Sequence, residues 1–311
     1  MRQTSLDLRA GRPVGSFEAL LVLIAAVLLF APTALAQGKL GSQGIEGKPD
    51  REQQWLVPSP DPAIPSRAIL YRPPGDGPFR LAVIAHDSTQ NVLYRAQKRQ
   101  PEYRALAARL VARGFAVLVP ERPGHGATGG KYLEDQRGCD EADYSRAGRA
   151  TAEEISAALN YLRGQSFIRR DGVVIVGHSA GGWGALALAG ADPQAISAVV
   201  LFAPGRGGDA NDVPHKICAP HMLVATAGEF GRGARVPVTW LVAANDSFYP
   251  PEFSRKLAEA FRRGGGKVLF RVLPAAGSEG HWLAEKEAGM KTARAELDRA
   301  LKPPPARAKE R

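Results

Sequence analysis

The chain has 311 residues, of which 44% are hydrophobic and 23% charged, the balance of a globular protein that can bury a sizeable core. It carries 41 Lys and Arg residues against 31 Asp and Glu, which gives a formal net charge of +10. The basic residues are mostly scattered and do not form a stripe interleaved with aromatics, so we expect no nucleic-acid partner.

The first 36 residues have the three regions of a secretory signal peptide. Three arginines precede an apolar run over 19–30, and Ala34-Leu35-Ala36 supplies the small residues that signal peptidase recognises. The alternative is an uncleaved membrane anchor, but the run is shorter than a spanning helix requires. We therefore expect cleavage before Gln37, a periplasmic or secreted protein, and no stable membrane insertion of the mature chain.

Composition divides the remaining chain into three parts. Residues 37–60 are rich in Gly, Pro, Gln and charge and are expected to form a flexible lead-in. Residues 303–311 are expected to be a disordered basic tail. A single α/β domain over 61–302 holds the rest.

Within this domain, short apolar runs alternate with helical patterns. In chain order, strands are expected over 68–71, 81–85, 115–119, 173–176, 198–202, 236–243 and 267–272, and helices over 103–113, 144–163, 180–189, 221–230, 252–263 and 285–301. The runs are continuous rather than alternating, which is typical of strands covered on both faces. The pattern predicts a mostly parallel central sheet with helices on both faces, with 68–71 as an antiparallel edge strand.

The motif that carries chemistry is Gly177-His178-Ser179-Ala180-Gly181. The pattern G-x-S-x-G alone is weak, with roughly 0.2 chance occurrences expected in a chain of this composition. Here it follows an expected strand and opens an expected helix, which is the context of a nucleophile elbow. Ser179 is therefore interpreted as a nucleophile rather than an ordinary serine in a glycine-rich turn.

At this motif the chain resembles the α/β-hydrolase superfamily, and within it the dienelactone-hydrolase and esterase-like branches. The resemblance extends to His86-Asp87-Ser88, where relatives commonly have His-Gly before the residue whose N–H lines the oxyanion hole. It implies that the backbone N–H groups of Ser88 and Ala180 form that hole. Asp87 departs from the pattern, because it stands where relatives often have Gly.

Two further histidines belong to segments that match the family. Glu121-Arg122-Pro123-Gly124-His125-Gly126 resembles the Asp-x-Arg-Gly-x-Gly segment that follows the next strand in relatives. The resemblance implies structural roles for His86 and His125, although His125 is also a possible base. The stretch 205–235 is too short for a large helical lid, so we expect a fairly open cleft.

The remaining triad members are expected in the order acid, then histidine. Asp246 follows the strand expected over 236–243, and His281 lies in a loop before the last helix. Asp209 and Asp212 are alternative acids. A cap before Pro250 is the other interpretation of Asp246, and a surface loop position is the other interpretation of His281.

Cys139 and Cys218 are an even pair in a chain expected to be exported, so a disulfide between them is plausible, with two separate thiols as the alternative. His215, Cys218 and His221 stand three apart, a spacing that metal ligands can have. Pro220 argues against a regular helix presenting them together, and a fourth ligand is not evident. We expect no metal and no other cofactor.

These features predict a serine hydrolase that cleaves carboxylic esters of small molecules through an acyl-enzyme. A peptidase or acyltransferase with the same triad, or a non-catalytic binding protein on this fold, remain alternatives. Enzymes that attack with a carboxylate are disfavoured, because the elbow holds a serine. The aromatic residues beside the catalytic segments are candidates for the pocket wall or for the core: Trp183, Phe248, Tyr249 and Trp282.

Overall fold

The computed structural model describes residues 39–191 and 196–302, and at its centre lies a nine-stranded sheet. The expected signal peptide over 1–36 and tail over 303–311 lie outside the described residues. The strand order is β1-β2-β3-β5-β4-β6-β7-β8-β9. The strands are β1 (Gly41–Ser42), β2 (Gln53–Val57), β3 (Ser66–Tyr71), β4 (Arg80–Ala85), β5 (Phe115–Pro120), β6 (Val173–His178), β7 (Ile196–Phe202), β8 (Val238–Ala243) and β9 (Val268–Leu273).

Most of the sheet is parallel. From β5 to β9 neighbouring strands run in the same direction, whereas β1, β2 and β3 extend the sheet in antiparallel fashion. Strands β5, β6 and β8 are buried at every position, because helices cover both faces. The predicted α/β-hydrolase architecture, a mostly parallel sheet between helical layers, is confirmed.

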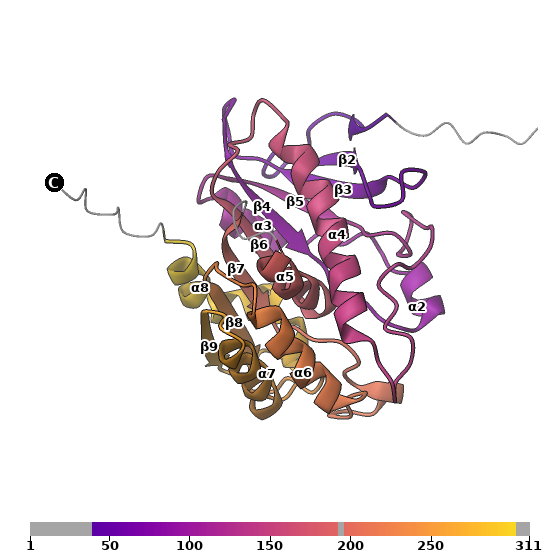
Figure 1. The fold of residues 1–311 in the computed structure, drawn as a ribbon. Helices are drawn as coiled ribbons and strands as arrows, with labels where there is room; N and C mark the ends of the chain where they lie inside the picture. The colour runs from indigo at the N-terminus through magenta and orange to yellow at the C-terminus, as the bar shows by residue number, and fades with distance from the viewer. Residues whose placement is uncertain (1–38, 192–195, 303–311) are drawn as a thin grey trace, which may run out of the picture. The chain divides into compact units, whose positions relative to one another are not determined.

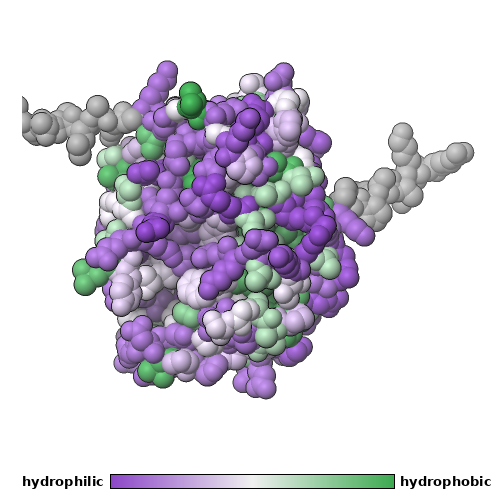
Figure 2. Space-filling model, turned by 180° about the vertical axis from the view of Figure 1, so that it is seen from behind, coloured by the Kyte–Doolittle hydropathy of each residue, from purple (hydrophilic) through white to green (hydrophobic). Residues whose placement is uncertain are grey.

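Two helical layers enclose the sheet (Figure 1). Helices α4 to α7 pack on one face around Ile155 and Trp183, and α3 and α8 pack on the other around Leu106 and Leu297. Figure 2 shows the molecule from behind, where hydrophilic side chains cover much of the surface. The helices are α2 (Val92–Ala96), α3 (Arg104–Val111), α4 (Tyr144–Arg163), α5 (Ser179–Ala191), α6 (Pro220–Gly231), α7 (Pro251–Arg263) and α8 (Glu287–Ala300), with 3₁₀ turns η1 (Ala210–Asp212) and η2 (Gly280–Ala284).

The prediction that residues 37–60 form a flexible lead-in is wrong for the part of this segment that the structure describes. Strand β2 lies within it and pairs along its whole length with β3. Trp55 and Val57 of β2 are buried, whereas Gln54 is exposed. This alternation is that of a strand with one face packed against the protein. The alternating pattern of β2 was missed because Gly, Pro and charged residues dominate the sequence around the strand. Strand β3 consequently lies between β2 and β5 and is not the edge strand expected over 68–71.

A disulfide joins Cys139 to Cys218, whose Cα atoms are 4.6 Å apart. Cys139 lies between β5 and α4, and Cys218 lies just before α6, so the bond links two connections that are distant in sequence. The hydroxyl of Tyr144, at the start of α4, donates to the carbonyl oxygen of Cys218 and fixes the same junction. Among the helices within the described ranges, none is both long and apolar enough to cross a bilayer.

Candidate active site

Ser179 lies at the sharp turn between β6 and α5. Its φ of 51° is in the left-handed region, which is strained for a residue with a side chain. A Cβ at Gly177 would lie 2.5 Å from Cα of Gly182, and one at Gly181 would lie 2.2 Å from the carbonyl oxygen of Ala85. Strand and helix approach so closely that only glycine fits at these positions. The turn therefore has the geometry of a nucleophile elbow.

Ser179, His281 and Asp246 form a continuous hydrogen-bonded chain. Nε2 of His281 lies 3.0 Å from Oγ of Ser179, and Nδ1 lies 3.3 Å from Oδ2 of Asp246. The carboxylate can only accept, so Nδ1 carries the proton and Nε2 is free to accept the serine proton. Three segments distant in sequence supply these groups: the β6–α5 turn, the loop after β8, and η2.

The loop after β8 holds the carboxylate of Asp246 in a buried position. Asp246 is 2% exposed, and the backbone N–H of Tyr249 donates to its Oδ1 at 2.9 Å. Its second oxygen is left for His281. Gly280 packs against this loop, since a Cβ there would lie 2.5 Å from Oδ1 of Asn245. The histidine and acid loops are thus held in direct contact.

Comparison with known proteins agrees with this geometry. A model of the alpha/beta hydrolase family matches residues 83–307, which is most of the chain. The chain belongs to the α/β-hydrolase family. No curated protein sequence matches it significantly.

Solved structures similar to this hydrolase include several esterases. An esterase from Pyrococcus furiosus superposes with a TM-score of 0.56 at 14% identity, covering 85% of this chain and 100% of its own. Acetyl xylan esterase 1 from Thermoanaerobacterium sp. gives 0.54 at 15% identity, covering 85% and 86%. A Klebsiella pneumoniae protein described as a dienelactone hydrolase gives 0.51 at 17% identity, covering 80% and 97%. At these identities the likeness establishes the fold.

The alternative acids do not face the histidine of this α/β hydrolase. Oδ2 of Asp209 lies 3.1 Å from Oγ of Ser247, and Asp212 lies in η1. Burial raises the pKa of Asp209 above its ordinary value, although the Ser247 hydroxyl opposes the shift. Of the three candidate carboxylates, only Asp246 bonds to the ring of His281 in the described residues.

Glu279 is a site residue that sequence reasoning missed. Its Oε1 accepts from the backbone N–H groups of His281, at 2.8 Å, and Ser247, at 3.1 Å. Its Oε2 lies 2.6 Å from Oγ of Ser247. Burial would raise the pKa of Glu279, but these donors hold it below its ordinary value. Glu279 thus ties the histidine turn to the segment after Asp246; its place two residues before His281 was the available signal.

Aromatic rings enclose His281 on several sides. Phe248 stacks on the imidazole with ring centroids 4.1 Å apart, and Trp282 and Tyr249 approach it at 5.0 and 5.6 Å. These three of the four candidate aromatics belong to the site. Trp183 instead lies in the core, where its Nε1 donates to the carbonyl oxygen of Tyr144.

His86 and His125 have the structural roles that the family resemblance implies. Nε2 of His86 accepts from the backbone N–H of Arg122 at 3.1 Å. Nδ1 of His125 faces the carbonyl oxygens of Arg122 and Pro123, so Nε2 accepts from Oγ of Ser88 at 2.7 Å. Burial holds the pKa of His86 well below its ordinary value and lowers that of His125 to about 4. Both are neutral and connect the loops after β4 and β5.

The loop that carries Ser88 begins beside the first turn of α5. Ala85 pairs with Gly177 across β4 and β6, so the residues after both strands emerge at the same edge. The first N–H groups of α5, including that of Ala180, have no acceptor within the helix. The hydroxyl of Tyr132 lies 3.1 Å from Oγ of Ser88 and further fixes this loop.

Asp87 is buried, and Lys98 neutralises its charge. The ammonium group of Lys98 forms an ion pair with Oδ2 of Asp87. Burial alone would raise the pKa of Asp87, but Lys98 and the neighbouring histidines lower it, so Asp87 is a carboxylate. Asp87, which stands where relatives often have Gly, therefore places a negative charge beside the site, and Lys98 compensates that charge.

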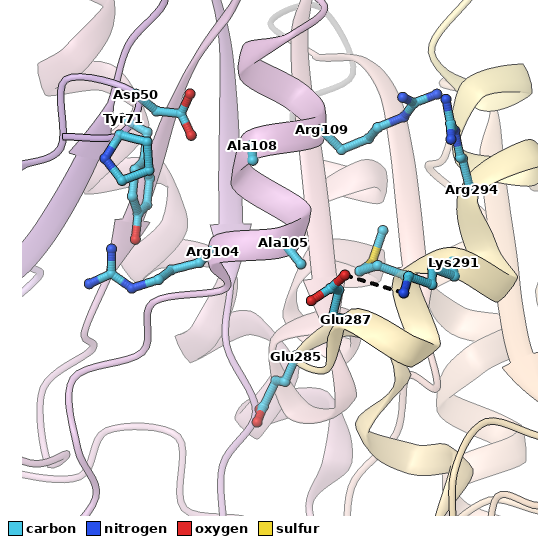
Figure 3. Close-up of a pocket in the computed structure, with 12 residues that line it drawn as sticks. Asp50, Tyr71, Arg104, Ala105, Ala108, Arg109, Glu285, Glu287, Lys291 and Arg294 are labelled. Atoms are coloured by element: carbon cyan, nitrogen blue, oxygen red, sulfur yellow. Dashed lines mark ion pairs between the residues drawn. The ribbon is translucent and has the colours of Figure 1, made fainter.

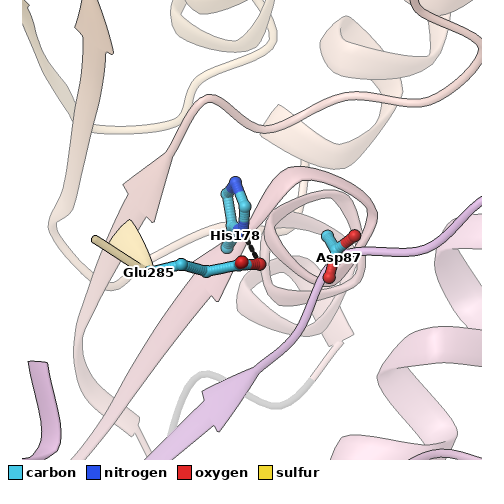
Figure 4. A group of neighbouring side chains, drawn as sticks. All are labelled: Asp87, His178 and Glu285. Carbon is cyan, nitrogen blue, oxygen red and sulfur yellow. Dashed lines mark ion pairs between the residues drawn. The ribbon is translucent and has the colours of Figure 1, made fainter. Parts of the chain in front are cut away.

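Two groups of side chains bear on metal binding. Cys218 is bonded to Cys139 and is not a thiolate for His215 and His221. Asp87, His178 and Glu285 offer ligand atoms within 4.8 Å of one another, as Figure 4 shows. Lys98 already supplies a cation to Asp87, and Tyr103 bonds to Nδ1 of His178 at 2.9 Å. Asp87 and His178 thus already have partners among the neighbouring side chains.

The side chains of Ser179 and His281 are almost fully buried. Ser179 is 5% exposed and His281 only 1% exposed, because the aromatic rings and neighbouring loops cover them. A cavity of about 590 Å³ bordered by described residues lies elsewhere, between α3 and α8 (Figure 3). The open cleft expected from the sequence stays a prediction.

Proposed function

We propose that this α/β hydrolase is an exported serine esterase that cleaves carboxylic esters of small molecules. The observation that carries the proposal is the chain from Oγ of Ser179 through His281 to the buried Asp246, with Ser179 in the strained conformation of an elbow. Strained backbone maintained at a nucleophile is a recurrent feature of active sites.

In the proposed reaction, His281 accepts the proton of Ser179 as Oγ attacks the ester carbonyl. Asp246 orients the ring and stabilises the imidazolium that forms. The imidazolium then protonates the leaving alkoxide, which departs as an alcohol and leaves an acyl-enzyme. Water, deprotonated by His281, attacks the acyl carbonyl and releases the carboxylic acid and free Ser179.

The N–H groups of Ser88 and Ala180 are the proposed donors to the oxyanion. Such donors commonly stabilise the transition state by several kcal/mol, about 3 kcal/mol for each. The pairing of Asp87 with Lys98 supports this assignment, because an uncompensated carboxylate beside the oxyanion would oppose the developing charge.

Export is supported by two independent features. Residues 1–36 have the regions of a signal peptide, and Cys139 is joined to Cys218 in a disulfide. Disulfides persist in oxidising compartments such as the periplasm. The mature enzyme is therefore proposed to begin at Gln37.

The proposal is tested by expressing the full chain and treating the exported fraction with a fluorophosphonate probe. We expect labelling of Ser179, a mature N-terminus at Gln37, and turnover of p-nitrophenyl acetate. Ser179→Ala should lose labelling and at least 10³-fold of turnover, since it removes the nucleophile. Ser197→Ala, a serine outside the site, is the matched control and should keep both.

Other outcomes would redirect or reject the assignment. Turnover retained in Ser179→Ala would reject it. Labelling with turnover of peptides but not esters would indicate a peptidase, and faster product formation with added alcohols would indicate acyl transfer. An unlabelled, inactive protein would support a binding function, and full-length chain retained in the membrane would reject export.

A further inference from the structure

The cavity between α3 and α8 has the size and lining of a small-molecule site. Its volume of about 590 Å³ falls within the range of known ligand pockets, roughly 300–1,000 Å³. Ala105 and Ala108 from α3, Met290 from α8 and the ring of Tyr71 supply its apolar wall. An apolar body the size of one or two rings would be accommodated against these side chains.

One end of the cavity carries excess positive charge. Arg109 from α3 and Arg294 from α8 both line this end, and Figure 3 shows both side chains extending from their helices. Asp298 pairs with Arg109 but also with Arg113, so one carboxylate serves two cations. Within the described part of the chain, no carboxylate forms an ion pair with Arg294. This end therefore carries more positive than negative charge.

The carboxylates that line the cavity do not offset this charge. Glu287 pairs with Lys291 at 3.4 Å, and Glu285 lies 3.4 Å from Nδ1 of His178 (Figures 3 and 4). Asp50 lies across the cavity from Arg109, as Figure 3 shows. The acidic groups that line the cavity are thus paired with other residues or lie across from Arg109, and Asp298 is shared between Arg109 and Arg113.

The cavity is distinct from the proposed ester site. The residues that line it, all within the described ranges, do not include Ser179 or His281. The two sites approach each other at Glu285, which forms part of the cavity wall and contacts His178. Nε2 of His178 in turn donates to the carbonyl oxygen of His281 at 2.8 Å. The buried ring of His178 therefore stands between the cavity and the catalytic groups.

We propose that this cavity binds a small amphiphilic organic anion, an aromatic or aliphatic body bearing a sulfonate or carboxylate. The anionic group binds the guanidinium of Arg294 through charge-assisted hydrogen bonds. Arg109, whose Nε and Nη2 already bind Asp298, adds positive charge to the same end of the cavity. The apolar body covers Ala105, Ala108 and Met290.

The test is a fluorescence titration of the mature enzyme with 8-anilinonaphthalene-1-sulfonate, an aromatic sulfonate that has both required parts. We expect saturable binding with one site per chain. Arg294→Glu should weaken binding at least tenfold, because it reverses the charge that faces the sulfonate. Arg263→Glu on α7 makes the same change of net charge on the other face of the sheet and should leave the dissociation constant unchanged.

A second variant and a blocked enzyme separate this cavity from other apolar surfaces. Ala108→Trp should fill the cavity and abolish binding without unfolding the protein, as checked by circular dichroism. Enzyme labelled at Ser179 with a fluorophosphonate should bind the probe as tightly as unlabelled enzyme. Equal weakening by the two Glu variants, full binding in Ala108→Trp, or loss of binding on Ser179 labelling would each overturn the proposal. Because binding is read without turnover, the result is independent of whether the chain is an esterase.

Discussion

In the proposed mechanism, the carboxylate that faces His281 determines how Ser179 is activated. Asp246 lies against Nδ1 of the ring, whereas Asp209 bonds to Ser247 beside it. A negative charge at Nδ1 fixes the tautomer in which Nε2 accepts the serine proton. The negative charge of Asp209 acts on the ring of His281 only electrostatically, because Asp209 does not bond to the ring. The two carboxylates are therefore chemically similar but mechanistically unequal.

Asp246→Asn should lower kcat for p-nitrophenyl acetate by about 10⁴, because the amide favours the wrong histidine tautomer. Asp209→Asn, the matched control in the neighbouring loop, should lower it by no more than about tenfold. Steady-state kinetics on both variants decides the assignment. Comparable losses in the two, or a larger loss in Asp209→Asn, would contradict the role given to Asp246.

His125 makes the stability of the protein depend on pH. Its ring is buried and neutral, and burial lowers its pKa from 6.5 to about 4, whereas the unfolded chain keeps the ordinary value. Between these values the unfolded state binds the extra proton. Stability is therefore full above pH 6.5 and declines as the pH falls towards 4. Protonation also removes the acceptor for the hydroxyl of Ser88.

The free energy of unfolding should fall by about 3 kcal/mol between pH 6.5 and pH 4 on account of His125 alone. Urea unfolding of the wild type and of His125→Gln across this range isolates the contribution. The variant should start less stable and lose correspondingly less as the pH falls. Parallel pH profiles for the two proteins would show that His125 is not the group responsible.

At the scale of elements, the turn from β6 into α5 depends on two glycines. The carbonyl oxygen of Ala85, at the end of β4, occupies the space where a side chain of Gly181 would begin. This contact brings the loop after β4 close to the elbow. The loop that carries Ser88 and the turn that carries Ser179 are thus positioned by the packing of backbone on backbone.

Gly181→Ala should destabilise the protein by about 3 kcal/mol or prevent folding, because the new Cβ would lie 2.2 Å from a backbone oxygen. The control is Gly228→Ala in α6, where the nearest atom would lie 3.4 Å away. That variant should be neutral or more stable by up to about 1 kcal/mol, since alanine favours a helix. Thermal unfolding compares the two, and similar stabilities would show that the elbow tolerates a side chain.

Continuous apolar runs and helical periodicity were enough to predict the central strands and helices from the sequence. Tyr144–Arg163 is a helix over the whole predicted range, and β5 differs from prediction by one residue. Strand β2 was missed because it is short and its buried residues are Trp55 and Val57 in a segment dominated by loop-forming residues. Its stability comes from pairing with β3, a contact that local patterns do not encode.

The same distinction applies to the site: some of its residues could be predicted from local sequence motifs, whereas others depend on tertiary contacts. The elbow, Asp246 and His281 follow motifs and chain order, so their positions were predictable. The role of Glu279 and the stacking of Phe248 on the imidazole were not predictable, although Phe248 was a candidate for the pocket wall. Both depend on the approach of the loop after β8 to η2. The enclosure of Ser179 likewise depends on loop packing that the length of the segment over 205–235 does not reveal.

At the scale of the whole domain, the disulfide links the two long connections that follow β5 and β7. Both emerge at the edge of the sheet where Ser179 lies. Arg206, which follows β7, also forms an ion pair with the buried Glu134 in the connection after β5. Burial alone would raise the pKa of Glu134, but Arg122 and Arg206 hold it well below its ordinary value. Covalent and ionic links thus hold the same pair of loops against each other.

Replacing both cysteines with serine should lower the free energy of unfolding by about 4 kcal/mol, because the bond closes a loop with a sequence separation of 79 residues. Urea unfolding of the oxidised wild type and the double variant measures the difference. Reduction with dithiothreitol should destabilise the wild type by a similar amount and leave the double variant unchanged. Equal stability of oxidised and reduced wild type would mean that the ion pair of Arg206 and Glu134, rather than the disulfide, holds the two loops together.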